Sequence, residues 1–440
     1  MKSYYIFTYG CQMNAADSER LAHQLEEVGY IPTDDEKQAD LIILNTCAVR
    51  ENAELKTYGR IGELKHLKAK NPDLIIAVTG CMAQKNQAEM FKRAPHIDIV
   101  LGTHNIQHIN EMIAEVKRTH RHQINVDMDN TVLPELKAKP NGTFSAWVPI
   151  MNGCNKFCTY CIVPHVRGRE ISRPVELIVS DVMELGSKGF KEITLLGQNV
   201  NSYGLDFHDG TDFGTLVHAL DGIPGIERIR YMTSHPQDMT PDMIRAIGES
   251  SNMVTHLHLP AQSGSNRILK KMNRHYTVEH YKELISCARQ YIKNVVLTTD
   301  IIVGFPGESN EDFEKTVQLL RDVQYDMAYT FIFSKRSGTP AAIMEDQVTE
   351  EVKRVRLQQL MDVQNEISLR INKEMENKVF DIIVEGPSQK DPSMWFGRTS
   401  GNKMVLFSRE DSISIGDTVK ARIDKAQTWV LYGTVMNKGK

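Results

Sequence analysis

The stretch Gly153-Cys154-Asn155-Lys156-Phe157-Cys158-Thr159-Tyr160-Cys161 places three cysteines close together with the spacing Cys-x3-Cys-x2-Cys. It follows an apolar run over 147–151 that is typical of a β-strand. This spacing lets a short loop wrap around one centre, so we expect Cys154, Cys158 and Cys161 to bind a metal or a metal cluster. Three ligands leave one coordination position open, which is typical of a centre that reacts with another molecule.

Other residues leave alternatives open at this motif. A zinc site of three cysteines completed by His165 is the competing interpretation, although Pro164 restricts the approach of that side chain. Cys287 lies in a helical pattern, where we expect it to pack in a core. The chain has seven cysteines, an odd number, and shows no export signal, so we do not expect a disulfide framework.

Strand-like and helical runs alternate after the cysteine loop. Helical patterns over 175–185 and 311–323 are examples of the segments that separate the strands. The strand-like runs lie at 147–151, 193–196, 229–232, 256–259, 295–303 and 329–333. Six such units predict a partial (βα)6 barrel, because a full barrel of eight units takes about 250 residues.

The first segment of the chain, up to residue 127, also alternates apolar strands with helices and predicts an open parallel α/β sheet. Asp17 and Ser18 suggest an N-cap for its first helix. Cys11, Cys47 and Cys81 each closely follow one of its strands. Because ligands bind outside the carboxyl ends of parallel strands, we expect these three thiols to hold a second metal centre.

The rest of the chain divides into a linker and a tail. Residues 128–146 include Pro134, Pro140 and Gly142 and read as a linker. A charged helix covers 348–375. After it, short β-type runs at 379–384, 404–407, 418–423 and 429–435, separated by Gly-containing turns, predict a small antiparallel β-barrel. The predicted segments are therefore 1–127, 128–146, 147–375 and 376–440.

Composition excludes several classes of protein. The chain has 440 residues, 41% of them apolar and 25% charged, with a net charge of −4, so it is neither disordered nor coated with positive charge. No apolar run approaches the roughly 20 residues that span a membrane. The N-terminus turns polar by Gln12 without a signal-peptide pattern. We therefore expect a cytoplasmic protein with no membrane partner.

The cysteine motif, with an aromatic residue before its last cysteine and a partial barrel after it, resembles the radical S-adenosylmethionine superfamily. A second three-cysteine segment ahead of it resembles the methylthiotransferases over essentially the full chain. The local stretches Thr8-Tyr9-Gly10-Cys11-Gln12-Met13-Asn14, Asn45-Thr46-Cys47-Ala48-Val49-Arg50-Glu51 and Cys161-Ile162-Val163-Pro164-His165-Val166-Arg167-Gly168-Arg169-Glu170 are similar to the MiaB-type tRNA enzymes.

The resemblance implies a function and its cofactors. Enzymes of this type insert a methylthio group at C2 of an isopentenyl-modified adenosine next to the tRNA anticodon, using two [4Fe-4S] clusters and two S-adenosylmethionine molecules. The trio of Cys154, Cys158 and Cys161 would generate the radical that takes hydrogen from C2. The earlier trio, at the three strand ends, would hold the cluster that delivers sulfur. An electron donor such as a flavodoxin or ferredoxin is implied, and we expect a monomer.

Four further residues match the superfamily by position. Gly197 and Gln198 end the second barrel strand, where the superfamily contacts the amino group of the methionine moiety, and Gln262 and Gly304 follow the fourth and fifth strands. Polar and Gly-rich strand ends are where a barrel presents its active site, so these residues are candidate contacts of S-adenosylmethionine. Ordinary turn chemistry is the alternative.

The predicted RNA contacts have weaker support from the sequence. The segment 376–440 holds ten Lys and Arg against eight Asp and Glu, a net charge of +2. A barrel that packs against its own enzyme is the alternative to RNA binding. The candidate stacking and phosphate contacts are Trp395, Arg398, Lys403, Arg422 and Lys425 on the barrel, with Arg167 and Arg169 beside the cysteine motif.

Competing functions also remain. Within the same chemistry, the substrate could be a threonylcarbamoyl-modified adenosine in tRNA or an aspartate of a ribosomal protein. A non-catalytic iron–sulfur or zinc protein that binds RNA is the alternative of another class. Metal analysis after anaerobic purification separates this last class from the enzymes.

Overall fold

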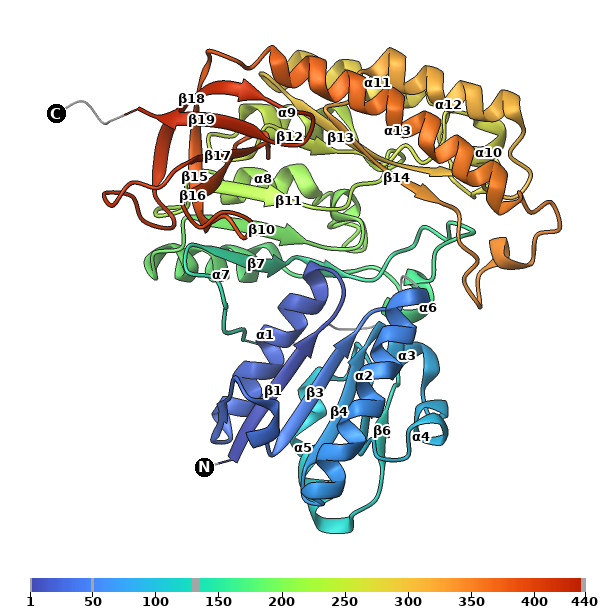
Figure 1. Cartoon of the computed structure of the whole chain (residues 1–440), viewed down its shortest axis with the longest axis vertical. Helices are drawn as coiled ribbons and strands as arrows, with labels where there is room; N and C mark the ends of the chain where they lie inside the picture. Colours follow the sequence, from blue (N-terminus) through green and yellow to red (C-terminus); the bar gives the residue numbers. More distant parts are fainter. Residues whose placement is uncertain (1, 49–50, 129–134, 136, 437–440) are drawn as a thin grey trace.

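The computed structural model describes residues 2–48, 51–128, 135 and 137–436. Figure 1 shows an α/β sheet at the N-terminus, a curved sheet covered by helices, and a small β-barrel near the C-terminus. In this described part of the chain, no helix is long and apolar enough to cross a membrane.

The N-terminal part is a six-stranded parallel sheet with the order β2-β1-β3-β4-β5-β6. Its strands are β1 (Lys2–Thr8), β2 (Tyr30–Pro32), β3 (Leu41–Thr46), β4 (Ile75–Gly80), β5 (Ile99–Leu101) and β6 (Gln123–Asn125). Its helices are α1 (Gln12–Glu27), α2 (Glu51–Lys70), α3 (Cys81–Asn86), α4 (Glu89–Arg93) and α5 (Ile109–Thr119).

Helices cover both faces of this sheet. Leu41 and Ile43 of β3 pack with α1 and α5, whereas Ile42 and Leu44 pack with α2, α3 and α4. The central strands β3 and β4 are buried at every position, as expected for a sheet between two helical layers. The predicted open parallel α/β sheet is confirmed.

The start of α1 differs from the prediction. The helix begins at Gln12 with Cys11 at its N-cap, so Asp17 and Ser18 lie inside the helix and do not cap it. Both side chains are buried and have tertiary partners, since Asp17 pairs with Arg167 and Ser18 accepts a hydrogen bond from Asn45. Long-range contacts of these polar side chains, which the local pattern does not show, override the capping preference.

The central part contains the six predicted strands, all parallel. They are β7 (Ser145–Pro149), β10 (Glu192–Leu196), β11 (Arg228–Tyr231), β12 (His256–His258), β13 (Val296–Val303) and β14 (Met327–Ile332). They form two three-stranded sheets, and a parallel bridge between Ile229 and Met253 lies between β11 and β12. This arrangement confirms a partial barrel.

Helices surround the outer face of the partial barrel (Figure 1). They are α7 (Val175–Ser187), α8 (Phe213–Leu220), α9 (Pro241–Glu249), α10 (Asn266–Lys271), α11 (Val278–Tyr291) and α12 (Asn310–Val323). The long helix α13 (Glu350–Lys373) packs against β14 and α12. Cys287 is partly buried and packs against the large apolar core of this part, as predicted.

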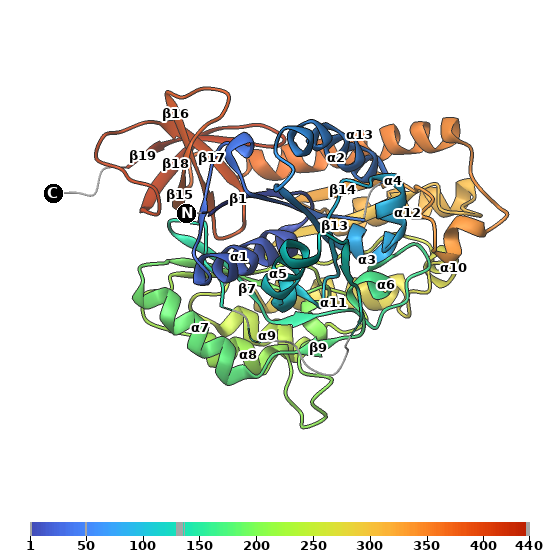
Figure 2. The ribbon, with the colours of Figure 1, turned by 90° about the horizontal axis from the view of Figure 1, so that it is seen from below.

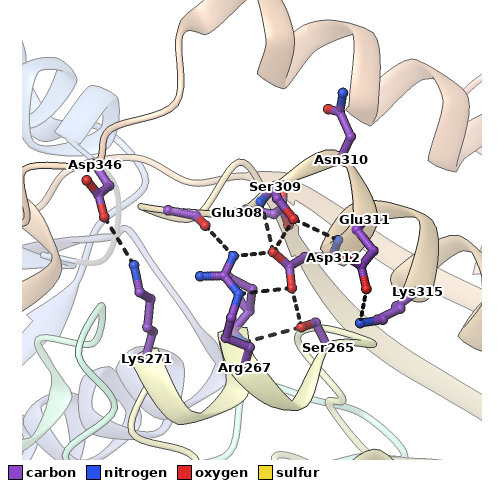
Figure 3. Close-up of polar contacts among 12 residues, drawn as sticks. Ser265, Arg267, Lys271, Glu308, Ser309, Asn310, Glu311, Asp312, Lys315 and Asp346 are labelled. Atoms are coloured by element: carbon purple, nitrogen blue, oxygen red, sulfur yellow. Dashed lines mark hydrogen bonds and ion pairs between the residues drawn. The ribbon is translucent and has the colours of Figure 1, made fainter.

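A buried carboxylate ties the turn after β12 to the turn after β13. Asp312 of α12 accepts hydrogen bonds from the hydroxyls of Ser265 and Ser309, at 2.6 Å each, and pairs with Arg267 (Figure 3). Because Ser265 caps α10 and Ser309 caps α12, one side chain fixes the start of both helices. These contacts of Asp312 hold in place the two Gly-containing turns of the predicted site, the one after β12 and the one after β13.

The tail is a closed five-stranded barrel with the order β15-β16-β17-β19-β18. Its strands are β15 (Val379–Pro387), β16 (Met394–Thr399), β17 (Met404–Ser408), β18 (Thr418–Ala426) and β19 (Leu431–Val435). The predicted small barrel is confirmed, with β16 as an added strand and with one parallel pair, β17 and β19, among antiparallel ones.

The boundaries between the three parts stay predictions. The described residues between β6 and β7 form neither helix nor strand, which agrees with a linker, but Pro134 lies outside the described residues. Figures 1 and 2 both show the tail barrel on the other side of the molecule from α3 and α6.

Candidate active site

The loop with Cys154, Cys158 and Cys161 lies between two short strands, β8 (Met151–Asn152) and β9 (Ile171–Ser172), whose pairing closes its base. Barrel residues hold it from the other side. The amide of Thr159 donates to the carbonyl of Met272 at 3.0 Å, and the side-chain amide of Asn273 donates to the carbonyl of Phe157 at 2.8 Å. The loop is therefore held in place by the protein itself.

Gly153 and Gln198 set the entry of this loop. The backbone of Gly153 has φ +82°, and a Cβ there would collide with the carbonyl oxygen of Arg169. Its amide donates to the side-chain oxygen of Gln198. The structure thus gives Gln198, a predicted cofactor contact, a positioning role for the cysteine loop.

Burial dominates the chemistry of these thiols. It raises the pKa of Cys154 to about 12 and the pKa of Cys161 to about 11, with Cys158 adding to both shifts. Arg274 donates a hydrogen bond to the sulfur of Cys158 at 3.7 Å. Buried thiols of this kind lose their protons when a metal binds, and soft thiolates are the ligands of iron–sulfur clusters.

Buried polar atoms without partners gather at the carboxyl ends of the barrel strands. Within the described residues, four of them are Oδ1 of Asn199, Oγ of Ser234, Nε2 of His235 and Oε1 of Gln262. Buried polar groups are normally hydrogen-bonded, so a bound polar ligand accounts for this group. The amino, carboxylate and ribose groups of S-adenosylmethionine fit such a set of donors and acceptors.

The four predicted contacts of S-adenosylmethionine have different surroundings. Gln262 is buried, has φ +65° and keeps an unpartnered side-chain oxygen, which fits a ligand contact. Gly197 leaves room for the side chain of Met151, and Gly304 leaves room for the side chain of Lys353. These two glycines therefore have packing reasons of their own, and their cofactor role stays a prediction.

The first trio lies at three adjacent strand ends. Cys11, Cys47 and Cys81 follow β1, β3 and β4, which are neighbours in the sheet. A Cβ on Gly10 would lie 2.8 Å from the Cβ of Cys47, so only glycine allows this close approach. The three strand ends are therefore adjacent, and the binding of a metal centre by their thiols stays a prediction.

Two asparagines lock the strand ends of the first trio together. The side-chain amide of Asn14 donates to Oδ1 of Asn45 at 2.8 Å, and the side-chain amide of Asn45 donates to the carbonyl of Asn14 at 2.8 Å. Cys11 Sγ lies 3.3 Å from Oδ1 of Asn14. Both asparagines are fully buried, so they position the cysteine loops, a role that the motif alone did not reveal.

A short helix, α6 (Val163–Arg167), joins the two trios. It directly follows Cys161, and its residue Val166 packs with Cys81. The hydroxyl of Thr103 donates to the carbonyl of Val166 at 2.7 Å, which attaches α6 to the N-terminal sheet. The second trio therefore ends two residues before α6, and Cys81 of the first trio packs against this helix; Figure 2 shows α3, which begins with Cys81, beside α6.

Arg167 does not fit the predicted phosphate contact. It is 3% exposed, and its Nη2 pairs with Oδ2 of Asp17 at 2.7 Å. It also lies within hydrogen-bond reach of Cys81, whose pKa burial raises and Arg167 lowers. The reason for the difference is burial, because the N-terminal sheet covers the side chain and places it beside the first trio.

The thiols of each trio do not converge on one point. Among the described residues, no three Cys, His, Asp or Glu side chains are arranged to hold a single metal ion. A four-iron cluster makes a different demand, because each cysteine binds a separate iron. His165, the fourth ligand of the alternative zinc site, is exposed on α6 and packs edge-on against Phe157.

Comparisons with known proteins match the three parts of the fold. The uncharacterized protein family UPF0004 matches residues 3–102, the radical SAM superfamily matches 148–320, and the TRAM domain matches 373–436. A tRNA-2-methylthio-N(6)-dimethylallyladenosine synthase of Acetivibrio thermocellus is 50% identical over 438 residues, 99% of this chain and 91% of the relative. Another, of Carboxydothermus hydrogenoformans, is 48% identical over 99% of both chains. The chain belongs to this synthase family.

Family membership confirms the predicted resemblance and makes the chain a radical S-adenosylmethionine enzyme of the methylthiotransferase class. The superfamily match assigns it S-adenosylmethionine and a [4Fe-4S] cluster. Among solved structures, the methyltransferase TsrM of Kitasatospora setae matches with a TM-score of 0.59 at 13% identity, over 78% of this chain and 75% of that chain. This likeness shows only that the two chains share a fold.

The predicted RNA contacts divide into exposed and packed residues. Arg169 is exposed and lies 4.5 Å from the ring centre of Phe157, and Arg422 and Lys425 are exposed on β18. By contrast, Lys403 is 10% exposed and pairs with Asp326 at 2.6 Å. The first three are exposed, although Arg422 pairs with Asp424 at 3.0 Å, and their role as RNA contacts stays a prediction. Lys403 instead attaches the barrel to the central part.

The last two predicted contacts also have partners within the protein. Arg398 pairs with Glu385 at 3.0 Å, and its carbonyl accepts a hydrogen bond from Arg228 at 2.9 Å. Trp395 packs against the barrel core, with Arg409 near its ring. One face of the tail barrel thus packs against the enzyme itself, as the alternative to RNA binding describes.

Proposed function

We propose that the chain inserts a methylthio group at C2 of an isopentenyl-modified adenosine beside the anticodon of tRNA, and that it uses two [4Fe-4S] clusters. The observation that carries this proposal is that one cysteine trio lies in the loop just before α6, while Cys81 of the other trio packs against Val166 of the same helix. The names of the relatives, which are 48–50% identical, support the substrate. The buried polar atoms at the strand ends support a place for S-adenosylmethionine.

The two centres would have separate tasks. Cys154, Cys158 and Cys161 would hold one cluster, and Cys11, Cys47 and Cys81 would hold the other. When these groups and S-adenosylmethionine are bound, the former centre supplies the radical that takes hydrogen from C2 and the latter supplies the sulfur. A C–H carbon has no acidic proton, so a general base alone would not suffice.

The chain's own residues prepare this reaction in three ways. Burial of Cys154 and Cys158 keeps water away from the reactive centre. Burial, together with the charges of Arg274 and Lys156, lowers the pKa of His235, so its ring stays neutral. The backbone amide of Gln237 donates to Nδ1 of that ring, which leaves the proton on Nε2 as a donor toward a ligand.

The tRNA would contact the exposed cations. Arg169 with Phe157 beside the cysteine loop offers a phosphate contact and a stacking surface, and Arg422 with Lys425 offers a second positive patch on the tail barrel. A flavodoxin or ferredoxin as electron donor, a monomeric state and a cytoplasmic location stay predictions.

Two measurements test the proposal. Mass spectrometry of digested tRNA from a strain lacking the chain should show loss of the methylthio group, which the wild-type chain restores. The reconstituted chain should hold roughly eight irons, the content of two four-iron clusters. Loss of the methylthio group from a threonylcarbamoyl-adenosine or from a ribosomal-protein aspartate, instead of from the isopentenyl-modified adenosine, would contradict the proposed substrate. Stoichiometric zinc in place of iron would contradict the proposed clusters.

Cysteine variants test the division of tasks. Cys154→Ala should abolish both S-adenosylmethionine cleavage and tRNA product, whereas Cys81→Ala should still form 5′-deoxyadenosine but no methylthio product. Cys287→Ala is the matched control, because this partly buried cysteine lies on α11, outside both trios. Full methylthiolation by Cys81→Ala would overturn the proposed role of the first trio.

A further inference from the structure

Arg274 lies beside the cysteine loop and is 6% exposed. Its guanidinium donates from Nε to the hydroxyl of Tyr276 at 2.7 Å and from Nη2 to the carbonyl of Pro260 at 2.8 Å. Its Nη1 lies 3.2 Å from the hydroxyl of Tyr160 and 3.7 Å from the sulfur of Cys158. All three nitrogens are therefore directed at groups around the second trio.

Arg274 differs from the other buried arginines of the described chain. Four others are equally buried, and each forms an ion pair with a carboxylate: Arg167 with Asp17, Arg173 with Glu135 and Asp181, Arg228 with Glu192, and Arg356 with Glu308. Within the same described residues, Arg274 forms no ion pair with Asp or Glu. Its partners are two tyrosine hydroxyls, a carbonyl and a thiol.

A buried charge without an opposite charge is unfavourable, and arginine cannot relieve it by losing its proton. The tyrosine partners do not supply the charge, because burial raises the pKa of Tyr276 to about 12, so its hydroxyl is neutral near pH 7. The remaining partner is Cys158, which becomes a thiolate when it binds iron. The environment of Arg274 is thus balanced only when the second trio carries an anionic group.

We propose that Arg274 is a positioning residue whose guanidinium is the counter-charge of the cluster held by Cys154, Cys158 and Cys161, and that it sets the reduction potential of that cluster. This inference rests on the proposed function. The N–H donor and the positive charge stabilise the cluster more when it is reduced, because the reduced cluster carries one more negative charge. Arg274 therefore raises the reduction potential of the cluster and makes the cluster easier to reduce.

The test measures the midpoint potential of this cluster alone. The full-length chain with Cys11→Ala, Cys47→Ala and Cys81→Ala serves as the background, so that iron binds only to the second trio. Arg274→Met removes the charge and the donors, and Arg274→Lys keeps the charge. Arg356→Met is the matched control, because Arg356 is equally buried but pairs with Glu308 away from the cysteines.

A redox titration followed by electron paramagnetic resonance should show a more negative midpoint potential for Arg274→Met, an intermediate value for Arg274→Lys, and the background value for Arg356→Met. An unchanged potential in Arg274→Met, or the same shift in Arg356→Met, would overturn the inference. If Arg274→Met binds no iron, Arg274→Lys decides: retained iron supports the role of the charge, and lost iron refutes it. Failure of the background chain itself to bind iron would instead contradict the proposed function.

Discussion

The ion pair between Arg167 on α6 and Asp17 on α1 joins the part of the chain that carries the second trio to the part that carries the first. One substitution can test this attachment. The paired atoms lie 2.7 Å apart, and the side chains are 4% and 5% exposed. Asp17→Asn keeps the shape but removes the negative charge, which leaves Arg167 buried without its carboxylate. Removing one partner of a buried pair costs about 3–5 kcal/mol. We expect this loss to weaken the attachment of α6 to α1.

Hydrogen–deuterium exchange followed by mass spectrometry measures this loss locally. Since about 1.4 kcal/mol corresponds to a factor of ten, a loss of about 3 kcal/mol predicts exchange roughly a hundredfold faster in the peptide that covers α6. Asp242→Asn is the control, because Asp242 and Arg245 form an exposed pair worth about 0–1 kcal/mol. The reasoning is refuted if α6 exchanges at the same rate in Asp17→Asn as in Asp242→Asn.

Three further predictions follow from the site. Iron binding should tighten as the pH rises from about 7 to 9. Burial raises the pKa of thiols such as Cys154, and these thiols must lose their protons when iron binds. An iron affinity that does not depend on pH would contradict this prediction. Gly10→Ala should lose about half of the iron, whereas Gly29→Ala, whose φ is also positive but which has open space around it, should keep it, as iron analysis will show. Arg422→Gln should reduce by about one unit the slope with which the logarithm of the tRNA affinity falls with the logarithm of the salt concentration. Lys403→Gln should leave this slope unchanged.

The sequence predicted those parts of the fold that depend on local pattern. Apolar runs and glycines identified the six barrel strands and the three strand ends that carry Cys11, Cys47 and Cys81. It missed β16, whose mixture of aromatic, glycine and charged residues has no regular alternation, although Gly397 is needed there beside the carbonyl of Ile383. Strand pairing in a closed barrel, not residue preference, determines such a strand.

Charged residues were harder to place than cysteines. A cysteine motif restricts chemistry by its spacing, but the role of an arginine depends on what the rest of the fold places around it. Arg167 was expected to contact phosphate and is instead buried against Asp17. No sequence pattern singles out Arg274, because its partners Cys158 and Pro260 come from distant turns. Burial and pairing of charges arise from long-range packing, so one sequence without coordinates does not reveal them.

The tail barrel shows why the two interpretations of its cations are compatible. Lys403 pairs with Asp326 and donates to Asn372 at 2.7 Å, so it attaches the barrel to α13 and to the residue just before β14. That attachment fixes which side of the barrel remains exposed, and Arg422 and Lys425 lie on the exposed part of β18. A packed face that holds the barrel rigid also lowers the entropy that must be lost when RNA binds to the other face. Packing of one face against the enzyme is therefore compatible with the proposed binding of RNA to the other face.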